Sequence, residues 1–211
     1  MRDFRATQDA LSKKLLNRFS LPVGLPFTYA RKNQLTDAWG EFVSNDADVD
    51  VRADLTFKQM REVETPPLYG QMQTTQRVFL THALAVANIS QFCERLNYAC
   101  YRHAYNRYGK RINVVSAIEG GRGDWRENRS SSDMDKRFHT HLLLQLPAHL
   151  PFDDFSALVW KCWLGTEWGY GEGKIAMIKT KYHSAAYNVK TTLDAIDLQN
   201  THFNTDSRAT Q

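Results

Sequence analysis

Hydrophobic and polar residues alternate over 51–57, and this two-residue period predicts a strand with one buried face. Residues 112–119 are rich in β-branched side chains, and 137–146 and 174–178 are also largely apolar, so we expect three further strands there. The glycine-rich stretch 165–173 precedes the last of these strands and is expected to form a turn.

Segments with apolar residues every three or four positions alternate with these strands and predict helices. The longest runs from 74 to 108 without glycine or proline, so we expect one long helix there, with a potential break near Asn97. Thr74 or Thr75 is the expected N-cap and Gly109 the expected C-cap. Shorter helices are expected over residues 11–19, 35–42, 152–164 and 184–193.

The order strand, helix, strand, strand, helix, strand, helix predicts an α+β domain. We expect a central antiparallel sheet of four to five strands flanked by helices, with 137–146 as a central strand. An acidic connector after residue 45 suggests a helical N-terminal extension over 1–50, a main domain over 51–195 and a polar C-terminal tail over 196–211.

The composition of the 211-residue chain, 42% hydrophobic and 24% charged, is that of a soluble globular protein. It contains no run of 18 apolar residues, so we expect no transmembrane helix and no membrane partner, and we expect no secretory signal at the N-terminus. The three cysteines, Cys93, Cys100 and Cys162, form no CxxC pair. We expect reduced, buried thiols in a cytoplasmic protein.

Two histidines, His139 and His141, flank one residue within an expected strand. Because alternate residues of a strand point to the same face, both imidazoles can bind one metal ion. Glu119 ends the preceding strand and would lie beside them if the two strands pair antiparallel, which completes a three-ligand site with open positions. The alternative is that both histidines are structural and that Glu119 is solvated.

A tyrosine and a lysine, Tyr187 and Lys190, lie three residues apart where the last helix is expected. Residues at this spacing share a helix face and can present a phenolic oxygen and a cation to one phosphate. A tyrosine nucleophile needs activation, because the pKa of a free phenol is about 10. The alternative is a packed tyrosine beside an exposed lysine.

Three motifs in this order resemble those of the HUH endonuclease superfamily: Leu55-Thr-Phe57 on a first strand, His139-Thr-His141 on a later strand, and Tyr187-Asn-Val-Lys190 on a C-terminal helix. The resemblance covers about residues 51–195 and is closest to the single-tyrosine rolling-circle replication initiators of plasmids and phages. One departure is Thr140, because the family usually has a bulky apolar residue between the histidines. Tyr182 is expected to end the fourth strand, so we expect Tyr187 to be the single nucleophile.

The resemblance implies an HUH nuclease-like fold and an enzyme that nicks single-stranded DNA at an origin and later rejoins it. Glu119, His139 and His141 would bind Mg²⁺ or Mn²⁺, which polarises the scissile phosphate. Tyr187 would attack that phosphate to give a 5′-phosphotyrosine and a free 3′-OH, and Lys190 would stabilise the charge. A host helicase is a candidate partner, since the chain has no GxxxxGK[ST] motif.

Two other functions remain open at this point. One is a single-tyrosine transposase or a relaxase of the same superfamily. The other is a nucleic-acid-binding domain without catalysis.

Positive charge is weak overall, with a net charge of +4 and a pI of about 8.9, but it is clustered. Residues 94–111 carry five cations and one acid, and 172–192 carry four cations and one acid. Such clusters attract phosphates, so we expect DNA contacts from Arg102, Arg107, Lys110, Arg111, Lys179 and Lys181. Trp125 lies in a loop whose charges cancel, and it can stack on a base or cover the sheet edge.

Overall fold

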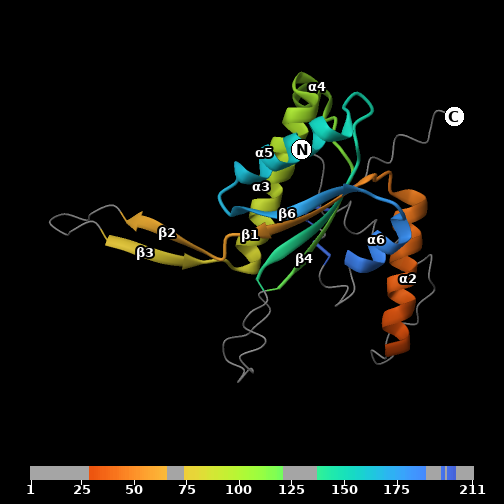
Figure 1. Ribbon diagram of the computed structural model, residues 1–211, viewed down its shortest axis with the longest axis horizontal. Coiled ribbons are helices and arrows are strands. Elements are labelled where there is room, and N and C mark those ends of the chain that lie inside the picture. Colours follow the sequence, from red (N-terminus) through yellow and green to blue (C-terminus); the bar gives the residue numbers. More distant parts are fainter. Residues whose placement is uncertain (1–28, 66–73, 121–136, 189–195, 198, 203–211) are drawn as a thin grey trace.

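The computed structural model describes residues 29–65, 74–120, 137–188, 196–197 and 199–202 (Figure 1). The described part is α+β, with one four-stranded antiparallel sheet, one two-stranded sheet and helices around them. Its strands are β1 (Val51–Phe57), β2 (Met60–Thr65), β3 (Thr74–Phe79), β4 (Val114–Glu119), β5 (His139–Leu144) and β6 (Gly169–Met177). Its helices are α2 (Tyr29–Asp46), α3 (His82–Tyr101), α4 (His103–Tyr108), α5 (Phe152–Leu164) and α6 (Lys181–Asn188).

The four-stranded sheet has the order β4-β5-β1-β6, and every neighbouring pair is antiparallel. β5 lies between β4 and β1, so the expected antiparallel sheet with 137–146 as a central strand is confirmed. In its register His139 lies opposite Glu119 and Thr56, and His141 lies opposite Ala117 and Asp54. The register therefore brings residues from three strands side by side on one face of the sheet.

The main hydrophobic core lies on the opposite face of the sheet, beneath α3 and α5. The apolar positions of β1 are buried there together with Leu142 and Leu144 of β5, as the alternating pattern predicts. Trp163 of α5 fills the centre, with its ring 5.0 Å from that of Phe57 and 5.7 Å from that of Phe92. Burial of these apolar side chains is the main source of stability for this layer.

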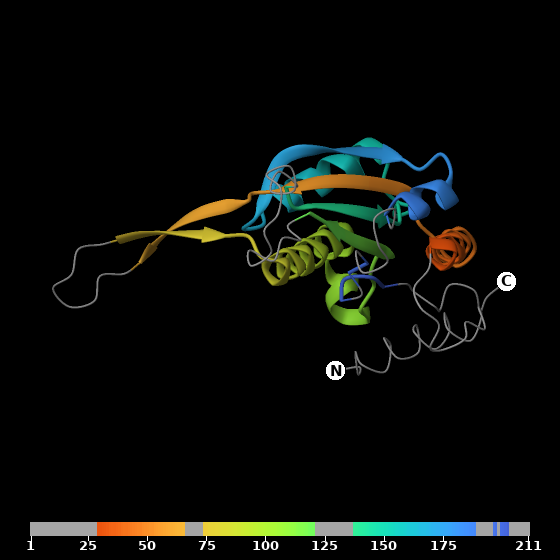
Figure 2. The ribbon, with the colours of Figure 1, turned by 90° about the horizontal axis from the view of Figure 1, so that it is seen from below.

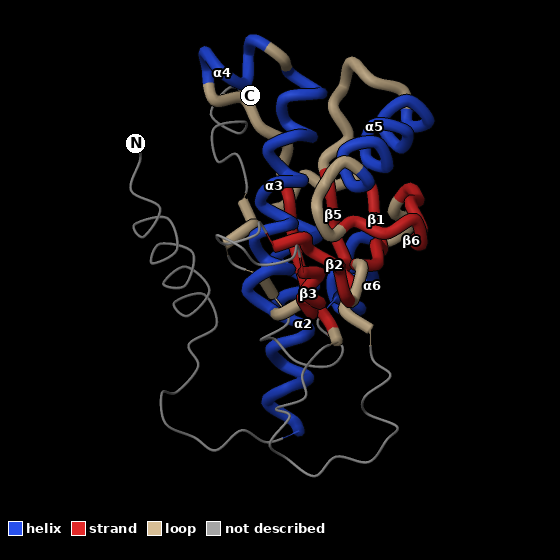
Figure 3. The backbone as a smooth tube through the Cα atoms, turned by 90° about the vertical axis from the view of Figure 1, so that its left-hand side faces the viewer, coloured by secondary structure: helices blue, strands red, loops and turns tan. Residues whose placement is uncertain are grey.

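A second, smaller core lies on the other face, where α2 and α6 cover one end of the sheet (Figure 3). It contains Trp39, Phe42 and Val43 of α2, Ala185 of α6, and Val115 and Leu143 of the sheet. The helix expected over 35–42 is longer in the structure, and it packs on the main sheet. The domain division at residue 50 itself stays a prediction, and the helix expected over 11–19 lies outside the described residues.

The prediction of a helix starting at residue 74 is wrong, because residues 74–79 form β3. β3 pairs with β2 in an antiparallel hairpin that extends away from the body of the molecule (Figure 2). Thr74, Thr75 and Val78 favour a strand, but their pairing partner, residues 60–65, had not been recognised as a strand. The base of the hairpin is held by an ion pair from Arg61 to Glu167.

The helix itself begins at His82, with the hydroxyl of Thr81 accepting a hydrogen bond from the amide of Leu84 at 3.3 Å. The chain breaks at Arg102, where φ is 47°, and not at Asn97. The buried side chain of Asn97 instead accepts a hydrogen bond from the amide of Ile112 at 2.9 Å. Gly109 is the C-cap in the left-handed conformation, as expected.

The last strand and helix also differ from the expectation. β6 begins at Gly169 and includes most of the expected glycine-rich turn. At position 173 of this strand, an added Cβ would lie only 2.3 Å from the carbonyl oxygen of Asp54. The close approach of β6 to β1 therefore requires glycine there. α6 begins at Lys181, so Tyr182 lies within this helix and the expectation that it ends a strand is wrong.

The expectation of buried, unpaired cysteines is confirmed. All three cysteines are buried and free, and burial raises the pKa of the Cys93 and Cys100 thiols to about 12. Among the described helices, none has the length and apolar character needed to cross a membrane.

The segment that includes His202 extends the edge of the main sheet, and it predicts a pH dependence of stability. His202 and Val114 exchange two backbone hydrogen bonds of 2.9 Å, and burial, reinforced by the charge of Arg111, lowers the pKa of His202 to about 4. An unfolded histidine has a pKa of about 6.5, so protons bind the unfolded chain first as the pH falls. The contribution of neutral His202 to the free energy of unfolding is therefore fully present above pH 6.5. It is lost between about pH 6.5 and 4, which lowers the free energy of unfolding by up to about 3 kcal/mol.

Chemical unfolding of the wild type and His202→Gln at pH 7 and pH 4.5 measures this effect. The variant should lose less stability than the wild type over this interval. His103→Gln, at an exposed position of α4, is the matched control and should behave as the wild type. Equal pH dependence in wild type and His202→Gln would contradict the assignment.

Candidate metal centre

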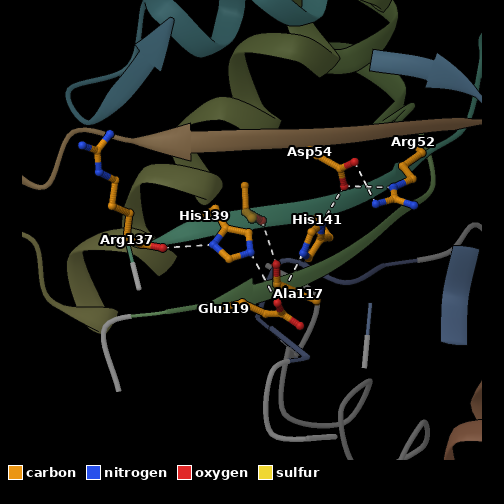
Figure 4. Close-up of polar contacts among 8 residues, drawn as sticks. Arg52, Asp54, Ala117, Glu119, Arg137, His139 and His141 are labelled. Atoms are coloured by element: carbon orange, nitrogen blue, oxygen red, sulfur yellow. Dashed lines mark hydrogen bonds and ion pairs between the residues drawn. The ribbon is translucent and has the colours of Figure 1, made fainter. Parts of the chain in front are cut away.

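Glu119, His139 and His141 lie together on the open face of the sheet, from two neighbouring strands (Figure 4). Oε2 of Glu119 is 3.3 Å from Nε2 of His139 and 3.5 Å from Nε2 of His141. The two imidazole rings are perpendicular, with centroids 4.9 Å apart. One potential ligand atom from each residue lies within 4.8 Å of the others, so this group could hold one metal ion.

The three side chains differ in their exposure. Glu119 and His141 are buried, at 8% and 3% relative exposure, whereas the side chain of His139 is 35% exposed. α2 and α6 cover the sheet at the other end of this face, over Leu143 and Val115. The cluster is therefore accessible from the side of His139, where water or a substrate oxygen can approach.

Hydrogen bonds at the far side of each imidazole determine which nitrogen faces Glu119. Nδ1 of His139 lies 3.0 Å from the carbonyl oxygen of Arg137, which can only accept, so this nitrogen carries the proton. Nδ1 of His141 lies 2.5 Å from Oδ1 of Asp54 and donates in the same way. In the neutral rings, both Nε2 lone pairs therefore point toward the Glu119 carboxylate.

This arrangement needs positive charge at its centre. Nε2 of His141 is buried and has no hydrogen-bond partner among the described residues. Its lone pair faces carboxylate oxygens, which is unfavourable unless a proton or a cation lies between them. Two imidazoles and one carboxylate fit a divalent transition metal, and the nitrogen ligands favour Mn²⁺ over Mg²⁺.

Asp54 and Arg52 of β1 support His141, and neither residue was expected at the site. Arg52 binds the Asp54 carboxylate with two nitrogens, Nε to Oδ1 at 2.9 Å and a terminal nitrogen to Oδ2 at 2.8 Å. Burial opposes ionisation of Asp54, but the hydrogen bonds and charges of His141 and Arg52 outweigh it and lower the pKa of Asp54. The signal for both residues is the set of polar positions in the alternation of β1, which share the face of the sheet that carries His141.

Tyr187 of α6 lies against this group of residues. Its ring centroid is 5.3 Å from that of His141, with the planes nearly perpendicular, and the guanidinium carbon of Arg52 is 4.2 Å from the ring centroid. The residue is 41% exposed, so the ring is also accessible to solvent. Tyr187 lies near the end of α6 and not at its start as expected, and Lys190 lies outside the described residues.

Tyr182 has a different environment in the same helix. Its hydroxyl donates a 2.6 Å hydrogen bond to Asp37 of α2, and this bond raises the pKa of Tyr182. Its ring lies over Gly40, where an added Cβ would come within 2.7 Å of a ring carbon. Tyr182 thus joins α6 to α2, and this contact depends on glycine at position 40.

The basic residues expected to bind DNA fall into two separate places. Arg102, Lys110 and Arg111 lie around α4, with their cationic groups 4.8 to 5.9 Å from the ring centroids of nearby tyrosines. Arg107 lies in the last turn of α4 itself. This region leads into the first residue of β4 (Figure 1), whereas Glu119 is the last, about 17 Å along the strand.

The second group of basic residues lies close to the candidate centre. Lys179 lines a pocket that also includes Arg52 and Asp54, and Lys181 is the first residue of α6. Of the two basic clusters, the structure therefore brings the described part of 172–192, and not 94–111, near the site. Trp125 lies outside the described residues.

Comparisons with known proteins give no match: no family model, no curated protein and no solved structure matches this chain. What can be said of the site therefore depends on its geometry and chemistry.

The first prediction from this site concerns metal binding. The wild-type chain should bind one Mn²⁺ in isothermal titration calorimetry, and His139→Ala or His141→Ala should abolish this binding, because each removes one of three ligands. His103→Ala on α4 is the matched control and should bind as the wild type. Retention of wild-type affinity by His141→Ala would disprove the centre.

The second prediction concerns Asp54. Asp54→Asn keeps an oxygen near His141 but removes the charge that orients its ring, so Mn²⁺ affinity should fall about 10- to 100-fold. The melting temperature without metal should be measured alongside. Unchanged affinity in a folded variant would show that Asp54 does not support the site.

Proposed function

We propose that this protein is a metal-dependent endonuclease of the HUH type that nicks and rejoins single-stranded DNA, in the role of a replication initiator. The observation that carries the proposal is the position of Tyr187, whose ring lies beside His141 of the candidate metal centre. A solvent-accessible phenol next to a metal-binding group is the arrangement that a tyrosine nucleophile requires.

The placement of the three motifs supports the same proposal. Leu55 and Phe57 are buried in the core, and Thr56 lies opposite His139 on the neighbouring strand. β1 and β5 are paired, and α6 brings Tyr187 onto the same face. β1 and β5, which are more than 80 residues apart in the sequence, therefore meet α6 on one sheet surface.

A divalent ion bound by Glu119, His139 and His141 would polarise the scissile phosphate and offset its negative charge. Tyr187 would lose its phenolic proton to water and attack the phosphorus with its phenolic oxygen. The bond from phosphorus to the 3′-oxygen breaks, this oxygen takes up a proton, and a 5′-phosphotyrosine remains. Attack by a 3′-OH reverses the step, and since one phosphodiester replaces another, joining needs no ATP.

Arg52 and Asp54 have supporting roles in this proposal. The guanidinium of Arg52 places positive charge against the Tyr187 ring, where it stabilises negative charge that develops on the phenol during attack. Asp54 fixes the tautomer of His141 and also binds Arg52. A change at Asp54 would thus affect both the metal ligands and the surroundings of the nucleophile.

A covalent-adduct assay tests the proposal. The protein is incubated with Mn²⁺ and a random-sequence pool of single-stranded DNA labelled at the 3′ end, because the 3′ fragment is the one that stays on the tyrosine. The wild type should form an adduct that resists denaturation, and Tyr187→Phe should form none, because it lacks the oxygen that makes the ester. Tyr182→Phe is the matched control and should retain most of the adduct.

Three results would contradict the proposal. A nucleotide found on Tyr182 by mass spectrometry would refute the assignment of the nucleophile. Adduct formation by His139→Ala would refute the role of the metal. The absence of any adduct from the wild type would favour a nucleic-acid-binding domain without catalysis.

A further inference from the structure

A pocket of about 350 Å³ lies beside the candidate centre, between β1, β6 and the start of α6. Ten residues line it: Arg52, Asp54, Lys174, Ala176, Met177, Ile178, Lys179, Thr180, His183 and Ser184. We call it the basic pocket. Its size is at the lower end of the range for small-molecule sites, and it suits a unit about as large as one nucleotide.

The charge of the basic pocket is positive. Three cationic side chains line it, those of Arg52, Lys174 and Lys179. The single carboxylate in the lining, Asp54, is already bound by Arg52 and His141. An anion that enters the pocket therefore meets excess positive charge.

Other groups in the pocket can hold a phosphate oxygen. Thr180 immediately precedes α6 and Ser184 lies in its first turn, and both residues line the pocket. The amide of Ser184 donates a hydrogen bond to the carbonyl oxygen of Thr180 at 3.1 Å. The first turn of this helix has no acidic residue, so its positive end is not neutralised locally. Hydroxyls, lysines and a helix start together are a usual environment for a phosphate.

The pocket shares Arg52 and Asp54 with the surroundings of the candidate metal centre, because Asp54 binds His141 and Arg52 lies over the Tyr187 ring. The metal-binding side chains come from β4 and β5, whereas the pocket lies over β1 and β6, the next two strands of the same sheet. In the register Lys174 lies opposite Asp54, which lies opposite His141. Tyr187 contacts both regions, since its ring lies against His141 and against Arg52.

We propose that the basic pocket binds a backbone phosphate of the single strand next to the scissile phosphate. This inference rests on the proposed function and extends it. It gives the path of the single-stranded DNA over the sheet, which runs from β4 and β5 across β1 to β6. The strand held at Tyr187 thus has a second anchor, and Lys174 and Lys179 position it without touching the reacting atoms.

Single-strand binding in EDTA tests this inference without metal or cleavage. The probe is a fluorescein-labelled oligonucleotide of thymidines, about 12 long, within the 4–16 nucleotides that single-strand sites cover. Fluorescence anisotropy at several salt concentrations gives the slope of log K against log salt, which is about −0.7 for each phosphate contact on a single strand. The double variant Lys174→Ala/Lys179→Ala should bind more weakly, with a slope smaller in magnitude by about 0.7, the value for the one phosphate contact that it loses.

The matched control removes the same charge elsewhere. Arg77→Ala/Lys161→Ala removes two exposed cations, one from β3 and one from α5, away from the basic pocket. It should keep the slope of the wild type, because neither residue is expected to contact the strand. An unchanged slope in the pocket variant, an equal decrease in the control, or no binding by the wild type would each overturn the inference.

A second probe separates a phosphate from a base as the occupant. In a thymidine oligonucleotide with neutral methylphosphonate linkages, the backbone charge is absent. The wild type and the pocket variant should bind this probe equally weakly. If the pocket variant still bound it less tightly than the wild type, the pocket would hold a base and the phosphate assignment would be wrong.

The two proposals can fail separately. Adduct formation on Tyr187 with an unchanged salt slope in the pocket variant would refute the basic pocket alone. A reduced slope in that variant without any adduct would refute the catalytic proposal alone.

Discussion

The strand register at β5 is the constraint on which the rest of the structure depends. It places Glu119 opposite His139, and Asp54 opposite His141, all on one face of the sheet. Because side chains alternate along a strand, a slip of one residue would turn both histidines into the core and expose leucines in their place. Burial of Leu142 and Leu144 under α3 and α5 therefore also determines which way the two imidazoles point.

Electrostatics at the open face follow from that register. The buried carboxylate of Glu119 faces two imidazoles whose other nitrogens are already hydrogen-bonded, one to a backbone carbonyl and one to Asp54. The protein thus stabilises an arrangement whose centre favours a cation. From β4 to β6 the side chains change from carboxylate and imidazole to arginine and lysine, and Tyr187 lies where the two parts meet.

Among the described residues, the helices cover this face only in part. α3 and α5 pack along the other face and form the main core, whereas α2 and α6 cover one end of the open face through Trp39, Val43 and Ala185. α6 is held on α2 by the contact of Tyr182 with Asp37 and Gly40. The same contact therefore helps to hold the helix that carries Tyr187, although Tyr182 itself lies in a structural position.

Local pattern in the sequence was sufficient for much of the fold and for the candidate ligands. The alternation over 51–57 predicted β1 and its buried face, and the two-residue spacing of His139 and His141 placed them on one face, because both effects depend on neighbouring residues alone. The β2–β3 hairpin, the start of α6 and the roles of Asp54 and Arg52 were decided by tertiary structure. A segment such as 74–79 suits either a helix or a strand until its partner strand is present, and Asp54 becomes a support for His141 only through pairing of strands 87 residues apart.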